Sequence, residues 1–182
     1  MKLRHAGLAD AESIAEIHAA SWRSTYGAVL NSTYLAETVP SERRQLWRER
    51  LTSPKPNQLV VAAEVDGRIV GFACVFSENH NTWGAYLDNL HVSHGFQGRG
   101  IGRALLAEVA LWCESQSPGR GLYLSVNQDN HRAQRFYLAL GARNTEPGIW
   151  NAPDGSKVPT FWFTWNSVAS LAQATDPSIE KT

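Results

Sequence analysis

The sequence is poor in cysteine and has no excess of either charge. Cys74 and Cys113 are its only 2 cysteines; they lie far apart and form no C-x-x-C pair, so neither a disulfide framework nor a zinc site is indicated. Lysine and arginine together number 17, as do aspartate and glutamate, which leaves no basic excess of the kind that binds nucleic acid. We therefore expect no metal and no nucleic-acid partner.

Long hydrophobic runs are also missing. No apolar stretch is long enough to cross a membrane, and the opening residues Met1–Arg4 begin a short strand rather than a secretory leader. Internal repeats and low-complexity segments do not occur in the sequence. These absences predict a cytoplasmic protein without a membrane partner, and the 182 residues suit one domain with a sizeable core.

The most informative feature that is present is a glycine-rich turn. A strand pattern over 87–92 precedes the turn, and a helical pattern over 104–110 follows it. The turn reads Gln97-Gly98-Arg99-Gly100-Ile101-Gly102-Arg103. Glycine permits positive φ and close approach of a ligand to the backbone, and the N–H groups at a helix start favour an anion. The turn therefore predicts a phosphate-bearing ligand; a glycine-rich turn without a ligand is the alternative.

The glycine spacing separates several kinds of phosphate-binding turn. Counted from Gly98 or Gly100, the third glycine of the dinucleotide fingerprint is replaced by Arg103 or Leu105. Gly95 and Gly100 have the spacing of a Walker A loop, but no Lys and Ser or Thr follow them. The pattern that fits is Gln-x-x-Gly-x-Gly, and in it the chain resembles the GCN5-related N-acetyltransferase (GNAT) superfamily. In that superfamily this turn wraps the pyrophosphate of acetyl-coenzyme A.

A second motif downstream supports the resemblance. A strand pattern over 122–127 precedes Asn130, a good helix N-cap, and Gly141 stands where a left-handed residue ends a helix. The apolar residues between them follow helical spacing; they are Ala133, Phe136, Tyr137 and Leu140. This segment resembles the superfamily's Asn-x-x-Ala-x-x-Phe-Tyr-x-x-x-Gly signature. Without the glycine turn upstream, Phe136 and Tyr137 would be interpreted as ordinary core residues.

The remaining patterns predict the order of the elements. Asp66-Gly67 is a strong hairpin signal, and Pro153-Asp154-Gly155 predicts a second hairpin. The expected strands are 2–4, 58–65, 68–76, 83–92, 122–127, 142–150 and 158–165, and the expected helices are 10–22, 41–51, one after the glycine turn and one from Asn130. This order indicates an α+β fold, with a mixed, mostly antiparallel sheet flanked by helices.

The resemblance implies how such a domain is built. It covers residues 1–166, which we expect to form a single N-acetyltransferase domain with the GNAT fold. It implies a sheet of seven strands flanked by four helices, splayed between the fourth and fifth strands and bulged in the fourth. The segment 167–182 is polar, contains Pro177 and is expected to be a loosely ordered tail.

The resemblance also implies where acetyl-coenzyme A, the expected cosubstrate, binds. Backbone groups of the fourth strand would pair with the pantetheine arm, and one N–H group would donate to the thioester oxygen, where charge develops. Arg99 and Arg103 would add positive charge near the phosphates, unless they are solvated surface residues. The cofactor-binding residues carried over are Leu90, His91, Val92, Gln97, Gly98, Arg99, Gly100, Ile101, Gly102, Arg103, Asn127, Asn130, Ala133, Phe136 and Tyr137.

Tyr137 and Asp88 are the predicted catalytic residues. By resemblance, the hydroxyl of Tyr137 faces the coenzyme sulfur and acts as general acid toward the departing thiolate. Asp88 lies near the expected reaction centre and is a candidate general base, with a structural, hydrogen-bonded carboxylate as the other interpretation. His91 is a further candidate base, and many members of the superfamily release the proton through ordered water. Strict alternation would put Asp88 and His91 on opposite faces of the strand, unless a bulge intervenes.

The acceptor is expected to bind near the first helix. His18, Trp22 and Tyr26 recur at helical spacing as an aromatic-polar stripe, for which core packing is the alternative. Part of the superfamily resembles this chain in a Ser-Trp-x-x-x-Tyr segment, a following Tyr-Leu pair (here Tyr34-Leu35) and a later Trp (here Trp47), which line the acceptor pocket there. The expected acceptor-binding residues are Trp22, Tyr26 and His91.

These features together predict an enzyme that transfers the acetyl group of acetyl-coenzyme A to a primary amine of a small molecule or peptide. The reaction expected from the resemblance is direct attack in a ternary complex, and a homodimer is expected on the same ground. Two alternatives stay open: a non-catalytic acetyl-coenzyme A sensor or regulatory module, and a generic nucleotide-binding protein.

Overall fold

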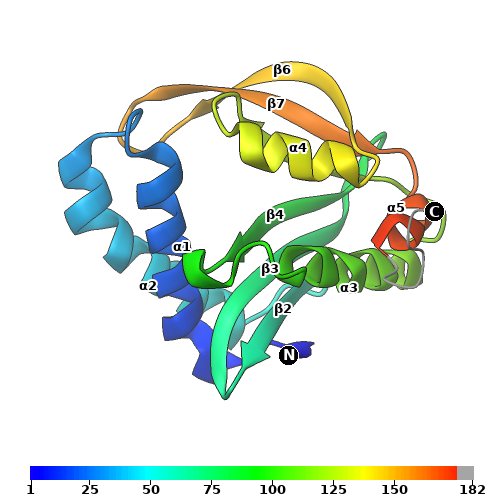
Figure 1. Cartoon of the computed structure of the whole chain (residues 1–182), viewed down its shortest axis with the longest axis horizontal. Helices are drawn as coiled ribbons and strands as arrows, with labels where there is room; N and C mark the ends of the chain where they lie inside the picture. Colours follow the sequence, from blue (N-terminus) through cyan, green and yellow to red (C-terminus); the bar gives the residue numbers. More distant parts are fainter. Residues whose placement is uncertain (176–182) are drawn as a thin grey trace.

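A mixed sheet of seven strands forms the centre of the fold (Figure 1). The computed structural model describes residues 1–175, and within them the strand order is β1-β2-β3-β4-β5-β7-β6. The strands are β1 (Lys2–His5), β2 (Gln58–Val65), β3 (Arg68–His80), β4 (Gly84–Val92), β5 (Leu122–Asn127), β6 (Arg143–Asn151) and β7 (Lys157–Trp165). All neighbours pair antiparallel except β4 and β5, which are parallel. The predicted α+β class and mostly antiparallel sheet are confirmed.

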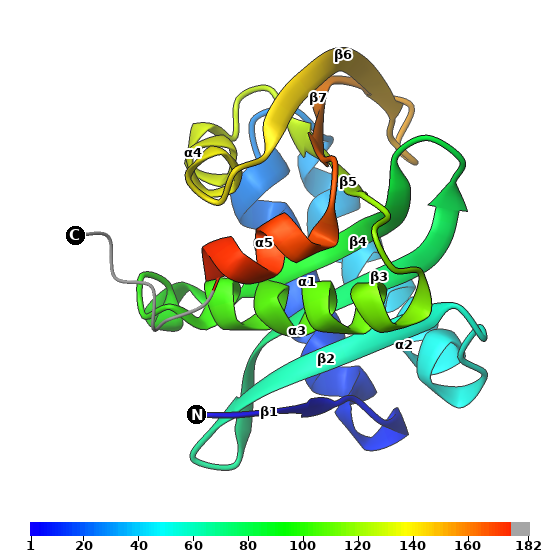
Figure 2. The same cartoon turned by 90° about the vertical axis from the view of Figure 1, so that its right-hand side faces the viewer.

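Helices cover both faces of this sheet (Figure 2). They are α1 (Ala11–Tyr26), α2 (Val39–Thr52), α3 (Ile101–Gln116), α4 (His131–Ala139) and α5 (Val168–Thr175). On one face, Ile14 of α1 and Trp47 of α2 pack against Phe72 of β3. On the other, Leu105 of α3 packs in the larger core cluster with Val61 of β2. Because both faces are covered, β2 and β3 are almost continuously apolar instead of alternating with polar residues.

β4 and β5 separate soon after they meet. Their parallel pairing consists of two residue pairs, Ala85 with Leu122 and Tyr86 with Tyr123. Beyond Tyr86, the edge of β4 toward β5 has no strand partner within residues 1–175. The predicted splay between the fourth and fifth strands is thus confirmed, and it lies beside the segment 87–92.

β4 also contains a bulge at Asp88. In the pairing with β3, Leu87 lies opposite Val75 and Asn89 lies opposite Cys74, so Asp88 is the extra residue. Leu87 packs in the core cluster on the α3 side, whereas Cys74 belongs to the cluster under α1 and α2. Because of the bulge, the side chains of Asp88 and Asn89 lie on the same side of β4 instead of alternating. Asn89 Nδ2 donates to Asp88 Oδ2 over 2.6 Å.

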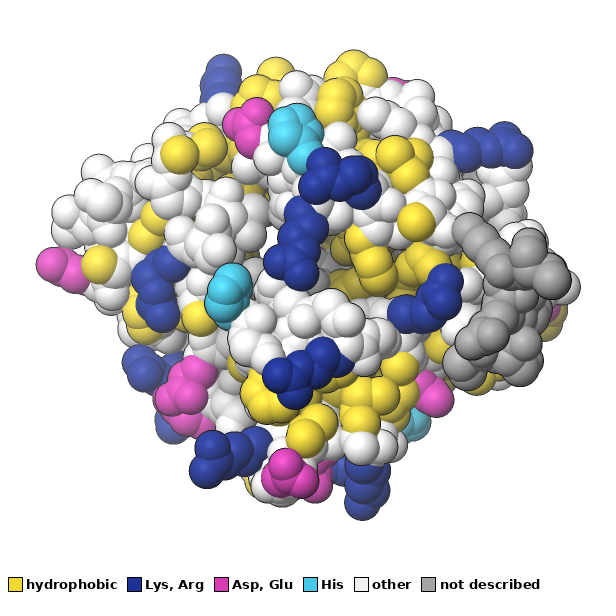
Figure 3. All heavy atoms as spheres, viewed as in Figure 1, with side chains coloured by type: hydrophobic (Ala, Val, Ile, Leu, Met, Phe, Trp, Pro, Cys, Tyr) yellow, Lys and Arg dark blue, Asp and Glu magenta, His cyan; other side chains and the backbone are white. Residues whose placement is uncertain are grey.

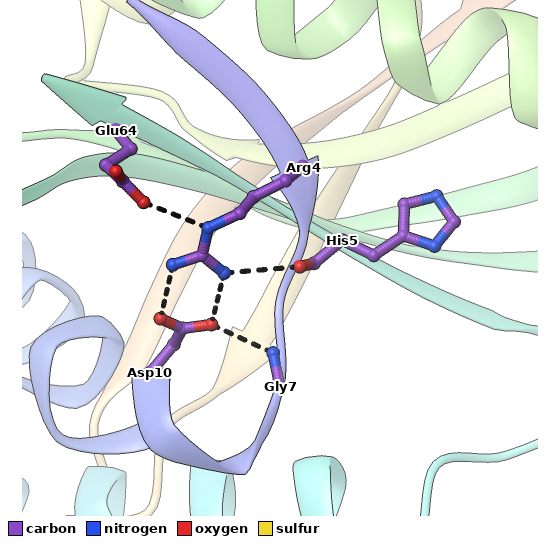
Figure 4. Close-up of polar contacts among 5 residues, drawn as sticks. All are labelled: Arg4, His5, Gly7, Asp10 and Glu64. Atoms are coloured by element: carbon purple, nitrogen blue, oxygen red, sulfur yellow. Dashed lines mark hydrogen bonds and ion pairs between the residues drawn. The ribbon is translucent and has the colours of Figure 1, made fainter. Parts of the chain in front are cut away.

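An ion-pair network ties the N-terminal strand to the start of α1 (Figure 4). Arg4 donates from Nη1 and Nη2 to the two carboxylate oxygens of Asp10 over 2.7 and 2.8 Å, and from Nε to Glu64 over 3.0 Å. The N–H of Gly7 also donates to Asp10 Oδ2 over 2.9 Å. The Arg4 guanidinium, more than any other group, holds the pKa of Asp10 below its ordinary value. Asp10 precedes α1 as predicted, but its carboxylate caps no N–H group of that helix.

Some element boundaries differ from the predicted ones. α1 continues to Tyr26, and α2 begins earlier than predicted, at Val39. A π-helix at Tyr34–Thr38, which no pattern predicted, leads into α2. The turn between β2 and β3 has Asp66 at φ 50° and Gly67 at φ 73°, as a two-residue Asp-Gly hairpin turn requires.

The expected loose tail contains a packed helix. Val168 and Leu171 of α5 are fully buried in the core cluster that includes α3. Loose order is therefore wrong for Val168–Thr175, because apolar residues at helical spacing outweigh the polar composition of the segment. The packed part of the chain extends beyond residue 166, and Pro177 lies outside the described residues.

Candidate active site

A cavity of about 660 Å³ lies where β4 and β5 separate. Its walls come from the C-terminal half of α1, from β4 and β5, from the glycine turn and from α4. In Figure 3, Lys and Arg side chains surround a recess on the face of the molecule that carries α3 and α4. The cavity therefore has a cationic rim on the side where the sequence predicts a phosphate-bearing ligand.

The glycine turn forms one end of this cavity. A 3₁₀ turn at His94–Phe96 leads from β4 into the glycines, and Gly98 and Gly100 have φ of 79° and 78°. A Cβ atom at either glycine would meet nothing within 4 Å, so the backbone faces open space. Gly102 lies in the first turn of α3, where the N–H groups have no helical partner. The side chain of Gln97 fixes the turn by donating to Val92 O over 2.9 Å.

Most of the predicted cofactor-binding residues line the cavity together. They are Leu90, His91, Val92, Gln97, Gly98, Gly100, Ile101, Gly102, Arg103, Asn130, Ala133, Phe136 and Tyr137. Arg99 does not; its guanidinium lies 5.1 Å from the ring centre of Phe96. Asn127 does not line it either, because it is buried and its Oδ1 accepts from Asp129 N–H over 2.9 Å in the turn before α4.

α4 forms the wall opposite the glycine turn. Asn130 caps it as predicted, accepting from Ala133 N–H over 3.1 Å, and Gly141 has the predicted left-handed conformation with φ of 85°. Arg132 of this helix lines the cavity and donates to Gln97 Oε1, so it links α4 to the glycine turn. The sequence prediction missed Arg132, although the residue lies inside the Asn-x-x-Ala signature and a cation there could have been noted.

Tyr137 lines the cavity and is the buried residue of α4. Its side chain is 8% exposed and packs against Phe136 and Trp165, with ring centres 5.2 and 6.0 Å apart. Within residues 1–175, no group forms a hydrogen bond with its hydroxyl. Burial raises the pKa of Tyr137, so the phenol stays protonated at neutral pH.

Asp88 lines the cavity but is already hydrogen-bonded. Arg50 Nη1 donates to Asp88 Oδ2 over 2.6 Å, and Asn89 Nδ2 donates to the same oxygen. These contacts are those of the structural carboxylate that the sequence left open as the second interpretation.

His91 lies beside Asp88 and Asn89 on the α1 side of the cavity. Its Nδ1 is 2.8 Å from Ser21 Oγ, and its Nε2 is 3.3 Å from Asn89 Oδ1. Burial lowers the pKa of His91 to about 4, so the ring is neutral at neutral pH. Ser21 is the Ser of the Ser-Trp-x-x-x-Tyr segment and Asn89 follows Asp88, but the sequence analysis named neither residue among the catalytic or acceptor-binding residues.

Of the predicted aromatic-polar stripe, only Tyr26 reaches the cavity. Trp22 is 9% exposed and packs against Trp150, with ring centres 5.3 Å apart. His18 is buried and its Nδ1 accepts from Trp47 Nε1–H over 3.0 Å. Trp22 and His18 thus have the contacts of core residues, the alternative stated for the stripe.

The later aromatic segment of the acceptor motif also packs inside the protein. Leu35 and Trp47 are buried, and Tyr34 donates its hydroxyl proton to Glu42 over 2.7 Å. None of the three lines the cavity.

The described residues contain neither a cluster of metal-ligating side chains nor a membrane-spanning helix. No group of three or more His, Cys, Asp or Glu side chains in residues 1–175 could hold a metal ion. No helix in the same range is long and apolar enough to cross a membrane.

Several proteins named N-acetyltransferases are similar to this chain. The uncharacterized N-acetyltransferase YuaI of Bacillus subtilis is 29% identical over 175 residues, covering 87% of this chain and 96% of YuaI. The L-amino acid N-acetyltransferase AaaT of Escherichia coli is 27% identical over 140 residues, covering 76% of this chain and 80% of AaaT. The PaiA N-acetyltransferase of Thermoplasma acidophilum, solved in complex with coenzyme A, superposes with a TM-score of 0.67 at 18% identity, covering 87% of this chain and 96% of that one.

A family comparison extends over the site itself. The model of the acetyltransferase (GNAT) family matches residues 12–142, a range that contains the glycine turn, the bulged β4 and α4. That range is more than half of the chain, and the sheet around it has the topology described above. The protein therefore belongs to the GNAT family of acetyltransferases.

Proposed function

We propose that the protein is an acetyl-coenzyme A-dependent N-acetyltransferase that acts on a primary amine of a small molecule or peptide. The observation that carries this proposal is one continuous cavity that joins the glycine turn to Tyr137 where β4 and β5 separate. Such a cavity suits a long ligand with a phosphate end and a reactive thioester end, and acetyl-coenzyme A is such a ligand.

The phosphate end of the cosubstrate fits the glycine turn. The N–H groups at the start of α3 and the open space beside Gly98 and Gly100 can accommodate an anion. Arg103 and Arg132 line the same end and supply positive charge. In this proposal the two arginines contact phosphate oxygens. Arg132 gives up its hydrogen bond to Gln97 and donates to a phosphate oxygen instead.

The arm of the cosubstrate fits the free edge of β4. Residues 90–92 line the cavity where β4 has no partner on the β5 side. Their backbone N–H and C=O groups can pair with the amides of the arm in the manner of an added strand. One of these N–H groups is also suitably placed in the chain to stabilise the oxyanion that develops on the thioester carbonyl.

The reaction proposed is direct attack in a ternary complex. The amine nitrogen bonds to the acetyl carbon, the carbon–sulfur bond breaks, and the sulfur takes a proton from Tyr137. Burial raises the pKa of Tyr137, so at neutral pH the phenol still holds the proton that the sulfur takes. Asp88 keeps the contacts of a structural carboxylate here, which leaves His91 and ordered water as the routes for the amine proton.

Thiol release against a panel of primary amines tests the proposal. The panel contains free L-amino acids, the class in the name of AaaT, together with an alanyl peptide, spermidine and tryptamine. We expect amine-dependent release of coenzyme A, and tighter binding of acetyl-coenzyme A than of NAD or ATP. Binding without turnover of any amine would favour the sensor alternative, and no binding of acetyl-coenzyme A would contradict the proposal. A cytoplasmic location and a homodimer stay predictions from the sequence.

A further inference from the structure

A chain of polar side chains leads from the acceptor side of the cavity into the protein. It begins at Ser21 on α1, passes through His91 and Asn89, and ends at Asp88 and Arg50. Ser21, His91, Asn89 and Asp88 all line the cavity. The bulge in β4 makes the chain continuous, because it brings Asp88 to the same side as Asn89 and His91.

The hydrogen bonds determine which nitrogen of His91 carries its proton. Asn89 uses its amide N–H to donate to Asp88 Oδ2, so its Oδ1 is the atom that faces His91 Nε2. An oxygen acceptor requires a proton on Nε2, and a neutral ring then has a lone pair on Nδ1. The Ser21 hydroxyl donates to that lone pair over 2.8 Å, which leaves its own oxygen lone pairs available to a ligand in the cavity.

We propose that Ser21 and His91 form a proton relay for the acceptor amine, with Asn89 and Asp88 as positioning residues. The relay rests on the proposed acetyltransferase function. As the nitrogen bonds to the acetyl carbon and the carbon–sulfur bond breaks, the nitrogen gives a proton to Ser21 Oγ, and Ser21 gives its own proton to His91 Nδ1. The sulfur takes the proton of Tyr137. His91 then loses its extra proton to solvent and Tyr137 regains one, so the products are an amide and a free thiol.

The residues on α1 and β4 around His91 favour this role. The ring of His18 stacks on His91 with centres 4.8 Å apart, and burial, more than its charged neighbours, lowers the pKa of His18. His18 therefore stays neutral and adds no second positive charge when His91 becomes protonated. Asn89 Oδ1 can accept from the imidazolium as well as from the neutral ring, so the ring does not have to turn during the transfer.

The charged groups that approach from α2 are already paired. Arg50 forms an ion pair with Asp88 over 2.6 Å, and Arg43 forms a longer one with Glu42 over 3.4 Å. On the cavity side, burial raises the pKa of Tyr26, as it does for Tyr137, so both phenols are protonated. Because burial lowers the pKa of His91 to about 4, its ring is neutral at every pH above about 5.

Substitutions at both members of the relay test it in kinetics. With the amine of the panel that has the highest kcat/KM, Ser21→Ala and His91→Gln should each lower kcat by roughly 100-fold, and the double variant should lose little more, since the two act as a unit. Ser21→Thr, which keeps a hydroxyl, should retain most of the activity. Ser13→Ala, on an exposed position of the same helix, is the control and should match the wild type. The affinity for acetyl-coenzyme A should stay within threefold in all variants.

The pH profile separates a relay from a structural role. At saturating amine, kcat of the wild type should be flat from pH 6 to 9, whereas kcat of Ser21→Ala should rise with pH, because hydroxide must replace the lost acceptor. A Ser21→Ala variant with kcat within threefold of the wild type, with an unchanged profile, or with an effect that multiplies that of His91→Gln would overturn the proposal.

A measurement on the protein without substrates tests the proton relay separately from the proposed acetyltransferase function. Nitrogen-15 NMR of labelled histidine should show His91 as the Nε2–H tautomer at neutral pH, titrating with a pKa of about 4. An Nδ1–H tautomer would overturn the relay even in an active enzyme. If the wild type turns over no amine, the acetyltransferase proposal fails on that result alone, whatever the tautomer.

Discussion

At the scale of single residues, Tyr137 and Asp88 differ in what their surroundings leave free. Tyr137 lines the cavity and its hydroxyl has no hydrogen-bond partner among residues 1–175, whereas Asp88 Oδ2 accepts from both Arg50 and Asn89. A group that donates a proton to a ligand is best placed when it has no hydrogen-bond partner in the protein. A carboxylate that positions two neighbouring side chains is best placed when both of them donate hydrogen bonds to it. Of the two predicted catalytic residues, we therefore expect Tyr137 to transfer a proton and Asp88 to hold its neighbours in place.

Replacing Tyr137 by Phe removes the acidic proton and keeps the ring. We expect kcat to fall by roughly 100-fold, the usual scale for one acid–base group, because the thiolate must then be protonated by water. Affinity for acetyl-coenzyme A should change by less than about tenfold, since at most one hydrogen bond is lost. Steady-state kinetics and calorimetric binding measure the two effects. Near-normal turnover of Tyr137→Phe would make Tyr137 a packing residue.

Asp10→Asn probes the charge network that ties β1 to α1. At pH 6 the variant should unfold with a free energy lower by about 2 kcal/mol, because the side chain is largely buried and its hydrogen bonds are to a charged partner. Arg4 lowers the pKa of Asp10 below the ordinary value of an aspartate, so this contribution is complete above that ordinary value of about 4 and is lost as the pH falls through the lowered pKa.

Denaturant unfolding of both proteins at pH 6 and at pH 3 provides the measurement for Asp10. The difference between wild type and variant should shrink at the lower pH. Glu108→Gln, at an exposed position of α3, is the control and should change stability by less than about 0.5 kcal/mol at either pH. An equal difference at both pH values would argue against the ion pair as its source.

At the scale of elements, the glycine turn can be tested with a matched glycine elsewhere. Gly98 and Gly119 both have positive φ, 79° and 73°, and a Cβ at either meets nothing within 4 Å. Gly98→Val and Gly119→Val should therefore destabilise the free protein similarly, by about 1–2 kcal/mol of backbone strain. Only Gly98 lines the cavity, so only Gly98→Val should weaken binding of coenzyme A, by more than tenfold. Equal affinities of the two variants for coenzyme A would contradict the binding of a phosphate at the glycine turn.

The last helix offers a second test at this scale. Leu171 of α5 is fully buried against the core cluster that contains α3, so Leu171→Ala should cost about 2–4 kcal/mol of folding free energy. Gln173→Ala, at an exposed position of the same helix, should change stability by less than about 0.5 kcal/mol. Thermal unfolding compares the two. A small effect of Leu171→Ala would mean that α5 adds little to the core.

At the scale of the whole molecule, the free energy of unfolding should depend on whether a ligand occupies the cavity. A ligand that binds only the folded protein adds about 2.7 kcal/mol when its concentration is 100 times Kd, which corresponds to a rise in Tm of roughly 5–10 °C for a chain of this size. We expect this rise with coenzyme A. Adenosine 3′,5′-bisphosphate lacks the arm and should give a smaller rise at the same concentration. No shift with either compound would contradict the assignment of the cavity to this cosubstrate.

The sequence by itself determined the features that depend on local conformation. Asp66-Gly67 specified a hairpin because its turn needs two residues at positive φ, and Asn130 and Gly141 specified the two ends of α4 through its cap and its left-handed last residue. The glycine turn was recognisable for the same reason, since its spacing is a property of consecutive residues. The fold class followed from the order of these elements.

Tertiary structure alone decided which side chains meet. Strict alternation separates Asp88 from His91, and only the bulge, whose position depends on the pairing of β4 with β3, brings Asp88 beside Asn89 in one chain of hydrogen bonds. Ser21 enters that chain from α1, 70 residues away from His91, and no local pattern marks such a contact. The same holds for Trp22, whose helical spacing suits a pocket and a core equally well. Only long-range packing decides between a pocket residue and a core residue, and the spacing of residues along the chain does not encode that packing.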